Sequence, residues 1–424
     1  MRVEASPAIS TPQFAPHLKH VEKGFVVPLK SYLRSALTPI YRARFYYHLP
    51  NTAKSERRKD LKGLGPDYGI EAEIAEAIAW LERAQDNSLS HDGGVARDFS
   101  LINGWSNSYP ETTGYIIPTL LTYSIRRNDE TIKQRTLKML DWLVSIQFAE
   151  GGFQGGVIGS QPRVPVTFNT GQILLGLASG ARLVSDEYRE PMRRAADWLV
   201  ETQDADGCWR KHPSPFAEPG EKVYETHVAW GLLEAATVDG NRKYAEAALA
   251  NIRWALKFQQ PNGWFQQCCL SDPAQPLTHT IGYALRGILE GYLFTKDPDL
   301  LAACCRTADG LIKAISPSGF LSGRLDSNWR GTVNWACLTG SLQIAYCLFV
   351  LAEHTASHRY RTAARALNSY VRRTISIRGR PETRGAVKGA FPVSGNYCSY
   401  EYPNWAVKFF IDSNLFEFDM SEDS

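Results

Sequence analysis

Apolar residues recur at helical spacing in two kinds of segment, which alternate from residue 70 to the C-terminus. Six segments carry charged residues along one face, as amphipathic helices on the outside of a core do: 71–85, 131–147, 187–203, 243–259, 298–315 and 358–375. Six others are apolar or small on every side, which is typical of buried helices: 111–124, 169–184, 225–237, 279–294, 334–353 and 404–416. The alternation predicts an all-α fold, an (α/α)6 toroid with six outer and six inner helices.

The starts of the apolar segments recur at a near-constant interval, which is the mark of a repeat architecture. Each start carries a polar residue: Glu111, Asn169, Glu225, His279, Asn334 and Asn404. In a toroid the inner helices run parallel, so we expect these six residues at one end of the barrel, around a common axis.

The first 63 residues contain no copy of the repeat. They begin with a proline-punctuated stretch and are basic between Lys19 and Lys62, so we predict a basic N-terminal extension over 1–63, followed by the toroid over 64–424. The piece 28–48 mixes apolar and basic side chains. Either it rests on an anionic membrane surface or it packs as a helix across the outside of the main domain.

Composition adds limits on compartment and partners. The 424 residues are 44% hydrophobic and 21% charged, which suits a large core, and a net charge of +3 is too small for a nucleic-acid binder. Eight cysteines without a CxxC pattern indicate neither a disulfide framework nor a zinc ribbon. With no apolar signal core and no apolar run long enough to span a bilayer, a cytoplasmic protein is predicted, and peripheral membrane contact stays open through the N-terminal segment.

Glycine–aromatic loops connect outer segments to inner ones. EGGFQGG (150–156), QDADGCW (203–209) and QQPNGWF (259–265) resemble the Gln–Trp repeats of the terpenoid cyclase and protein prenyltransferase superfamily. GWSNSYPETTGYIIPTLL (104–121) and YEYPNWAVKFFIDSNL (400–415) more closely resemble VpsJ-like toroid proteins of bacterial exopolysaccharide clusters and, more distantly, the C-terminal toroid of glucuronyl C5-epimerases. The resemblance covers about 65–424. It implies the toroid fold and a setting in polysaccharide synthesis, without a settled reaction.

The predicted mouth of the barrel carries the candidate chemistry. Six helix N-termini present unpaired N–H groups and partial positive charge, which suits an anion. The candidate catalytic acids and bases are Glu111, Glu225, His279, Tyr109 and Tyr400. The candidate substrate-binding residues are Arg97, Arg163 and Arg324 for an acidic group, Trp105, Trp335 and Tyr397 for stacking, and Asn169, Asn334 and Asn404 for hydrogen bonds. Helix capping and loop packing are the alternative roles of these residues.

Several signatures are missing from the sequence. It has no DxDD or DDxxD acid cluster, no prenyltransferase zinc set, no P-loop and no GxGxxG. We therefore predict no metal site and no cofactor.

Together these features favour an enzyme of polysaccharide synthesis that acts on an acidic sugar, by C5 epimerisation or β-elimination of a uronate in a glycan or lipid-linked sugar. Three alternatives remain: an inverting glycoside hydrolase that uses Glu111 and Glu225, a terpene-cyclase-like or prenyltransferase-like enzyme, and a non-catalytic glycan-binding scaffold. A wide arginine-lined cleft would favour glycans and a closed, aromatic, uncharged cavity would favour terpenes. A mouth plugged by its own loops would favour the scaffold.

Overall fold

The computed structural model describes residues 46–422 of the chain. The chain divides into two units, Met1–Leu49 and Pro50–Ser424, and the second unit contains all of the predicted repeats. The segment 28–48, for which a membrane-surface segment and a packed helix were both left open, falls outside the described residues except at its very end. The compact unit begins ahead of the predicted boundary at residue 64.

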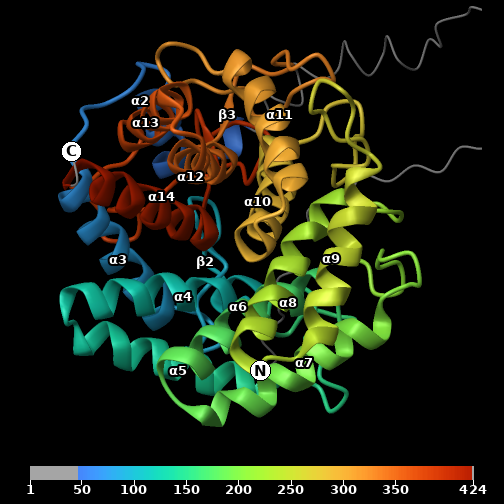
Figure 1. Ribbon diagram of the computed structural model, residues 1–424. Coiled ribbons are helices and arrows are strands. Elements are labelled where there is room, and N and C mark those ends of the chain that lie inside the picture. Colours follow the sequence, from blue (N-terminus) through green and yellow to red (C-terminus); the bar gives the residue numbers. More distant parts are fainter. Residues whose placement is uncertain (1–45, 423–424) are drawn as a thin grey trace, which may run out of the picture. The chain divides into compact units, whose positions relative to one another are not determined.

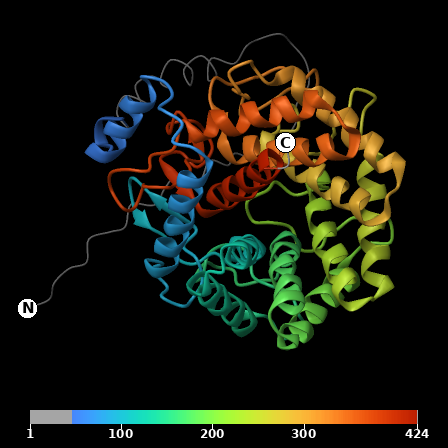
Figure 2. The ribbon, with the colours of Figure 1, turned by 60° about the vertical axis from the view of Figure 1, so that its left-hand side comes forward.

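Amphipathic and apolar helices alternate along the second unit and pack in pairs (Figure 1). The outer helices are α3 (Ile70–Asp86), α5 (Glu130–Ile146), α7 (Arg189–Thr202), α9 (Arg242–Leu256), α11 (Pro298–Ala314) and α13 (His358–Arg372). The inner helices are α4 (Pro110–Arg127), α6 (Thr167–Leu183), α8 (Thr226–Asp239), α10 (Thr278–Thr295), α12 (Leu338–Thr355) and α14 (Asn404–Glu422). Figure 2 shows the pairs in a ring in chain order, with the last inner helix beside the first pair. The predicted (α/α)6 toroid is confirmed.

Short strands close the ring between its first and last repeats. Strand β1 (Asp98–Ser100) lies between β2 (Gly104–Trp105) and β5 (Glu401–Pro403), with Phe99 opposite Tyr402. The pairing brings the loop after α3 against the loop before α14. A further helix, α2 (Asn51–Asp60), joins the same unit, because the buried carboxylate of Asp60 accepts from Lys388 Nζ at 2.7 Å.

Two inner helices start later than the sequence pattern predicted. α12 begins at Leu338 and not at Asn334, because Ala336–Cys337 form strand β3, which pairs with β4 (Ala390–Phe391). α8 begins at Thr226, after a 3-10 turn over Val223–Glu225. Both shifts change which side chains face the centre of the ring.

Glycines allow the inner helices to pack closely. A Cβ on Gly176 of α6 would lie 2.4 Å from the carbonyl oxygen of Gly114 on α4, and a Cβ on Gly287 of α10 would lie 2.1 Å from that of Thr226 on α8. Backbone atoms cannot give way as side chains do, so these positions accept nothing larger than glycine at the present helix separation.

We therefore expect Gly287→Ala to destabilise the protein by about 1–3 kcal/mol, the usual cost of overpacking. Gly291→Ala on the same helix is the control. Its Cβ would meet chiefly the methyl groups Ile252 Cδ1 and Leu300 Cδ1, which can move, and alanine favours the helix by up to about 1 kcal/mol. Urea unfolding of both variants measures the difference, and equal stability of the two would contradict the close-packing argument.

Candidate functional site

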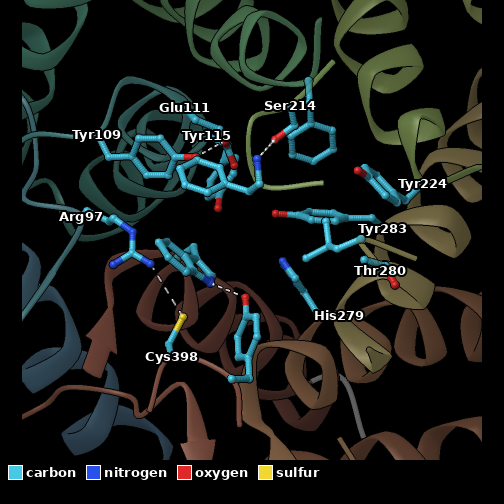
Figure 3. A pocket seen from close by; sticks show the side chains of 15 residues that line it. Arg97, Tyr109, Glu111, Tyr115, Ser214, Tyr224, His279, Thr280, Tyr283 and Cys398 are labelled. Carbon is cyan, nitrogen blue, oxygen red and sulfur yellow. Dashed lines mark hydrogen bonds between the residues drawn. The ribbon is translucent and has the colours of Figure 1, made fainter. Parts of the chain in front are cut away.

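A pocket of about 180 Å3 opens at the end of the ring where the inner helices begin (Figure 3). The second residue of four inner helices lines it: Glu111 of α4, Phe168 of α6, His279 of α10 and Trp405 of α14. The other lining residues are Arg97, Tyr109, Tyr115, Ser214, Phe216, Tyr224, Leu270, Thr280, Tyr283, Tyr397 and Cys398. The polar helix starts Glu111 and His279 thus face one cavity, as expected of a shared mouth.

One wall of the pocket is a continuous run of aromatic contacts from Tyr109 to His279. The rings of Tyr109 and Trp405 lie edge to face at 6.2 Å. The indole N–H of Trp405 donates to the Tyr397 hydroxyl at 2.9 Å, and the Tyr397 ring lies 5.4 Å from the imidazole of His279.

The run continues from His279 through Tyr283. Its ring lies 4.4 Å from the His279 imidazole and 5.1 Å from Phe168, which in turn contacts Tyr224 at 5.5 Å. Flat rings with polar tips suit a ligand that has apolar faces and hydroxyl edges.

Glu111 is the carboxyl group of the pocket. It is buried, and the Tyr109 hydroxyl donates to its Oε2 at 2.5 Å. Burial raises the pKa of Glu111 to about 7, against the hydrogen bond from Tyr109 and the charge of Arg97, which lower it. Near neutral pH this carboxyl group can therefore both hold and release a proton.

His279 is the second titratable group of the cavity. Burial lowers its pKa to about 4, while a hydrogen bond to Gln343 acts in the opposite direction. The imidazole is therefore neutral at physiological pH, with one nitrogen able to accept a proton.

Arg97 is the cation nearest these groups. Its guanidinium lies 5.2 Å from the centre of the Trp405 ring, pairs with Asp98, and lies 3.2 Å from Glu401 Oε2. Burial raises the pKa of Asp98 to about 6, although Arg97 opposes this shift. Because two carboxyl groups already contact Arg97, it offers a ligand less positive potential than an unpaired arginine would.

Five of the predicted site residues line the pocket: Arg97, Tyr109, Glu111, His279 and Tyr397. Two asparagines miss it by one position. Asn169 follows Phe168 and Asn404 precedes Trp405, and one residue turns a helix by about 100°. Both are fully buried, and the amide of Asn404 donates to the Ala96 carbonyl oxygen. Asn334 is exposed in the loop before α12, so the expectation that it opens an inner helix was wrong.

The two predicted tryptophans pack within the protein and not on the cavity. Trp105 lies in β2, with its ring 5.5 Å from Trp80 and 5.1 Å from Phe99. Trp335 is buried in a cluster with Leu277, and Tyr397 packs against this cluster. Trp335 therefore contributes to the pocket indirectly, by packing in the cluster that supports the lining residue Tyr397.

Two predicted arginines and one tyrosine also lie away from the lining. Arg163 stacks on Phe148, and Arg324 donates to the Gln275 carbonyl oxygen at 2.7 Å. Tyr400 is buried with a φ of 63° at the turn that leads into β5. We predicted several arginines around the mouth, but among the residues that line this pocket the arginine is Arg97 alone.

Glu225 is buried outside the pocket, and Tyr224 lines it instead. The reason is the 3-10 turn over Val223–Glu225, which shifts the register at this helix start. The two carboxyl groups expected for an inverting hydrolase, those of Glu111 and Glu225, therefore do not face each other across this pocket.

Burial raises the pKa of Glu225 to about 8, although the charges of Lys222 and Arg210 lower it. A carboxyl group with a raised folded-state pKa binds its proton more tightly in the folded protein. It therefore costs stability progressively as the pH rises from its unfolded pKa, about 4.5, to about 8. We expect Glu225→Gln to be more stable than the wild type at pH 8, by an amount on the order of 4 kcal/mol, and to lose this advantage near pH 4.

Thermal unfolding between pH 4 and pH 9 measures this difference. Glu246→Gln, on the exposed face of α9, is the control and should show no such pH dependence. A Glu225→Gln curve parallel to that of the wild type would mean that burial does not raise the pKa of Glu225.

Four aromatic residues of the pocket were not anticipated as a group: Phe168, Tyr224, Tyr283 and Phe216. Phe168 and Tyr283 belong to helices that are apolar on every side, so their sequence pattern is the same as that of core residues. Phe216 lies in the loop before α8 and is 57% exposed, and its only sequence signal is an aromatic residue in a proline-rich loop.

Within 46–422, no group of three or more His, Cys, Asp or Glu side chains is arranged to hold a metal ion. None of the helices in that range combines the length and the apolar composition that a membrane crossing needs.

The fold and the pocket define an α/α-toroid protein with an aromatic cavity at the N-terminal ends of its inner helices. The structure is similar to that of an unsaturated glucuronyl hydrolase specific for heparin, with a TM-score of 0.66 and 13% identity, over 83% of this chain and 98% of that one. It is also similar to cellobiose 2-epimerase from Bacillus thermoamylovorans B4167, with a TM-score of 0.62 and 12% identity, over 87% of this chain and 100% of that one. These likenesses concern the fold.

The sequence itself is similar to a terpenoid enzyme over a short stretch. The match is to ent-copalyl diphosphate synthase from Streptomyces sp. (strain KO-3988), 36% identical over 104 residues, which is 24% of this chain and 18% of that protein. The chain thus spans less than a fifth of that relative. No protein-family model matches the chain.

Proposed function

We propose that the chain is an enzyme that transfers protons on a single residue of an acidic sugar, by C5 epimerisation or β-elimination of a uronate in a glycan. The observation that carries the proposal is that Glu111 and His279 line one aromatic pocket and are both driven towards their neutral forms by burial. A protonated carboxyl group and a neutral imidazole are an acid and a base, which is what moving a proton from carbon requires.

The size of the pocket supports a single sugar residue as the reacting unit. Pockets for drug-sized molecules have volumes of about 300–1,000 Å3, whereas this one has about 180 Å3. The first turns of α4 and α10 direct backbone N–H groups to the same end of the ring, and Arg97 lies at the pocket wall. These groups would stabilise the negative charge that develops on a uronate carboxylate as its C5 proton leaves.

The polysaccharide setting rests on the resemblance to VpsJ-like proteins, and the substrate of such a setting is a glycan or a lipid-linked sugar. The similar structures that act on sugars support the carbohydrate class: their names include a glucuronyl hydrolase and a cellobiose epimerase.

A terpenoid cyclase is the second candidate, favoured by the short sequence match and by the aromatic lining. Two properties of the pocket weigh against it. Its volume is small for a twenty-carbon chain with a diphosphate. A carboxyl group with a pKa of about 7 is also a weak acid for protonating a carbon–carbon double bond.

Incubation with uronate-containing oligosaccharides in deuterium oxide tests the proposal. An epimerase should place deuterium at C5, and an eliminating enzyme should produce an unsaturated, ultraviolet-absorbing end. A new reducing end without either signal would replace the proposal by glycoside hydrolysis, which leaves the C5–H bond intact. Conversion of a prenyl diphosphate, with every glycan untouched, would favour the terpenoid candidate instead.

A further inference from the structure

Two buried histidines of the inner ring have the same partner on the same nitrogen. His279 Nδ1 lies 3.0 Å from Gln343 Oε1, and His227 Nδ1 lies 2.6 Å from Gln172 Oε1. In this orientation of the two amides the oxygen faces the ring and can only accept a hydrogen bond, which assigns the hydrogen to each Nδ1. In the neutral ring Nε2 then keeps its lone pair and is the basic atom.

The two histidines differ in what their Nε2 atoms face. His279 lines the pocket, and its ring points towards the cavity in Figure 3. His227 does not line it, and its Nε2 is buried without a hydrogen-bond partner in the described part of the chain. Both histidines have the same tautomer. The basic Nε2 of His279 can therefore reach a ligand in the pocket, whereas that of His227 cannot.

The packing of α10 and α12 holds Gln343 in contact with His279. Gln343 lies on α12, is 3% exposed, and does not line the pocket. Gly282, one turn after His279 on α10, makes room for it, since a Cβ there would lie 2.9 Å from Gln343 Oε1. Two adjacent inner helices thus combine to place one amide oxygen on one nitrogen.

We propose that Gln343 is a positioning residue, which holds His279 with the Nε2 lone pair towards the substrate and so makes this histidine the base of the reaction. The inference rests on the proposed function. In the proton-transfer step the C5 proton of the sugar moves to Nε2, and the electron pair of the C–H bond passes into the adjacent carboxylate as an enediolate. In epimerisation Glu111 then supplies a proton to C5. In elimination the electron pair of the enediolate forms the C4–C5 double bond, the C4–O4 bond breaks, and Glu111 supplies a proton to the departing O4 oxygen.

None of the other groups around His279 determines which of its ring nitrogens is protonated. Tyr283 on its own helix and Tyr397 on the loop before β5 contact the ring, and the Cys337 thiol at the start of α12 lies close to its backbone N–H. On the far side of Tyr283 lies His227, 4.4 Å from that ring. Within residues 46–422 the imidazole forms no hydrogen bond with a carboxylate, so the contact with Gln343 decides which nitrogen is protonated.

The first test needs no substrate. In the 15N spectrum of histidine-labelled protein, assigned with a His279→Asn variant, wild-type His279 should be protonated at Nδ1, and Gln343→Leu should give a mixture of tautomers. Gln172→Leu is the matched control, because it removes the same contact from His227 and should leave His279 unchanged. Protonation of wild-type His279 at Nε2 would overturn the role of Gln343, as would an unchanged tautomer in Gln343→Leu.

The second test measures turnover. Gln343→Leu should lower kcat at least about 10-fold with little change in KM, as part of the roughly 10²–10⁴-fold that a positioned base contributes. Gln343→Glu should shift the acidic limb of the pH profile upwards by about one pH unit or more, since a neighbouring carboxylate favours the imidazolium. A profile unchanged in both variants would overturn the proposal. Failure of the wild type to react with any glycan would instead refute the proposed function, and the tautomer result would stand on its own.

Discussion

Replacing Glu111 by glutamine is expected to lower kcat by roughly 100-fold or more while the protein stays folded. Glutamine keeps the size of the side chain and can still accept the hydrogen bond from Tyr109, but it cannot exchange a proton. General acid–base groups contribute on the order of 10²–10⁴-fold to turnover, which sets the scale of the loss.

The same carboxyl group determines the expected pH dependence. With a pKa of about 7, Glu111 is protonated below neutral pH and ionised above it. If it acts as the acid, turnover should fall about tenfold per pH unit above this value, and the fall should be absent from the residual activity of Glu111→Gln.

A buried glutamate on an outer helix provides the control for this experiment. Glu73 of α3 is fully buried, and burial raises its pKa to about 8, but it does not line the pocket. Glu73→Gln should therefore keep wild-type turnover. Equal losses in Glu73→Gln and Glu111→Gln would show that the assay reports on stability and not on catalysis.

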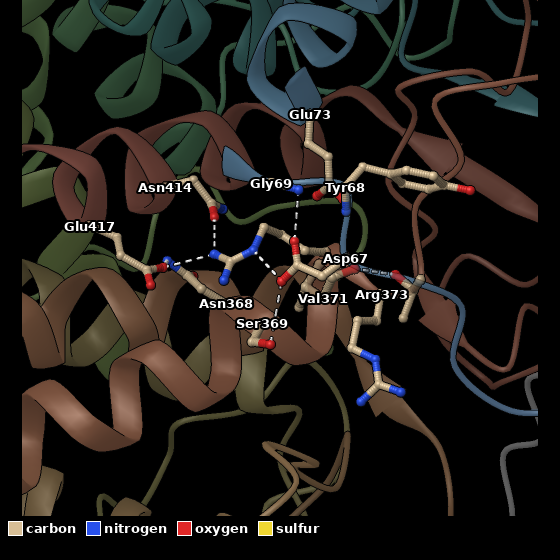
Figure 4. Close-up of polar contacts among 12 residues, drawn as sticks. Asp67, Tyr68, Gly69, Glu73, Asn368, Ser369, Val371, Arg373, Asn414 and Glu417 are labelled. Carbon is tan, nitrogen blue, oxygen red and sulfur yellow. Dashed lines mark hydrogen bonds and ion pairs between the residues drawn. The ribbon is translucent and has the colours of Figure 1, made fainter. Parts of the chain in front are cut away.

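The largest expected effect on stability comes from Arg372, near the end of α13. Its Nε lies 2.8 Å from Asp67 Oδ2, and its Nη1 lies 2.9 Å from Glu417 Oε2. The same Nη1 donates to Asn414 Oδ1 at 2.7 Å. Figure 4 shows Asp67 apart from Glu417 and Asn414, with dashed lines that mark these contacts. One arginine thus ties the last outer helix to the last inner helix and to the segment before α3, where the ring closes.

Removing this arginine leaves the buried carboxyl group of Glu417 without its cation. The side chains of Arg372 and Glu417 are each 8% exposed, and breaking one partner out of a buried ion pair costs about 3–5 kcal/mol. We expect Arg372→Ala to lose this amount, and Arg372→Lys to recover only part of it, since lysine cannot reproduce the forked geometry.

Arg126→Ala is the matched comparison. Arg126 of α4 pairs at 2.6 Å with Asp419 of α14, the helix that also carries Glu417, but both side chains are 43% exposed. Exposed pairs contribute about 0–1 kcal/mol, so this variant should be close to the wild type in urea unfolding. A loss of the same size in both variants would mean that burial does not set the strength of the Arg372 contacts.

The repeat architecture could be predicted from sequence because it depends on local patterns. Helices that are apolar on every side must be buried, and amphipathic helices alternating with them must cover them. The predicted starts Glu111 and His279 were close to the actual ones, and both residues occupy the second position of their helices and line the pocket. These two positions needed no knowledge of the neighbouring helices.

Tertiary structure decided which of the other helix starts reach the cavity. A shift of one residue turns a side chain by about 100°, so Phe168 lines the pocket and its neighbour Asn169 does not. At α8 the 3-10 turn places Tyr224, and not Glu225, in the lining. Starting a helix one residue earlier or later changes its local free energy little. The packing of adjacent helices and loops therefore determines where the helix starts.

Long-range pairing decided the electrostatics of the site. Arg97 and Glu401 meet because β1 and β5 join the two ends of the ring, and His279 and Gln343 meet because two inner helices pack side by side. The sequence by itself determined the helices, their inside and outside faces and the mouth at which polar helix starts gather. Only the packed ring decided which titratable groups are desolvated together, because the pKa of a buried group depends on what its neighbours exclude and donate.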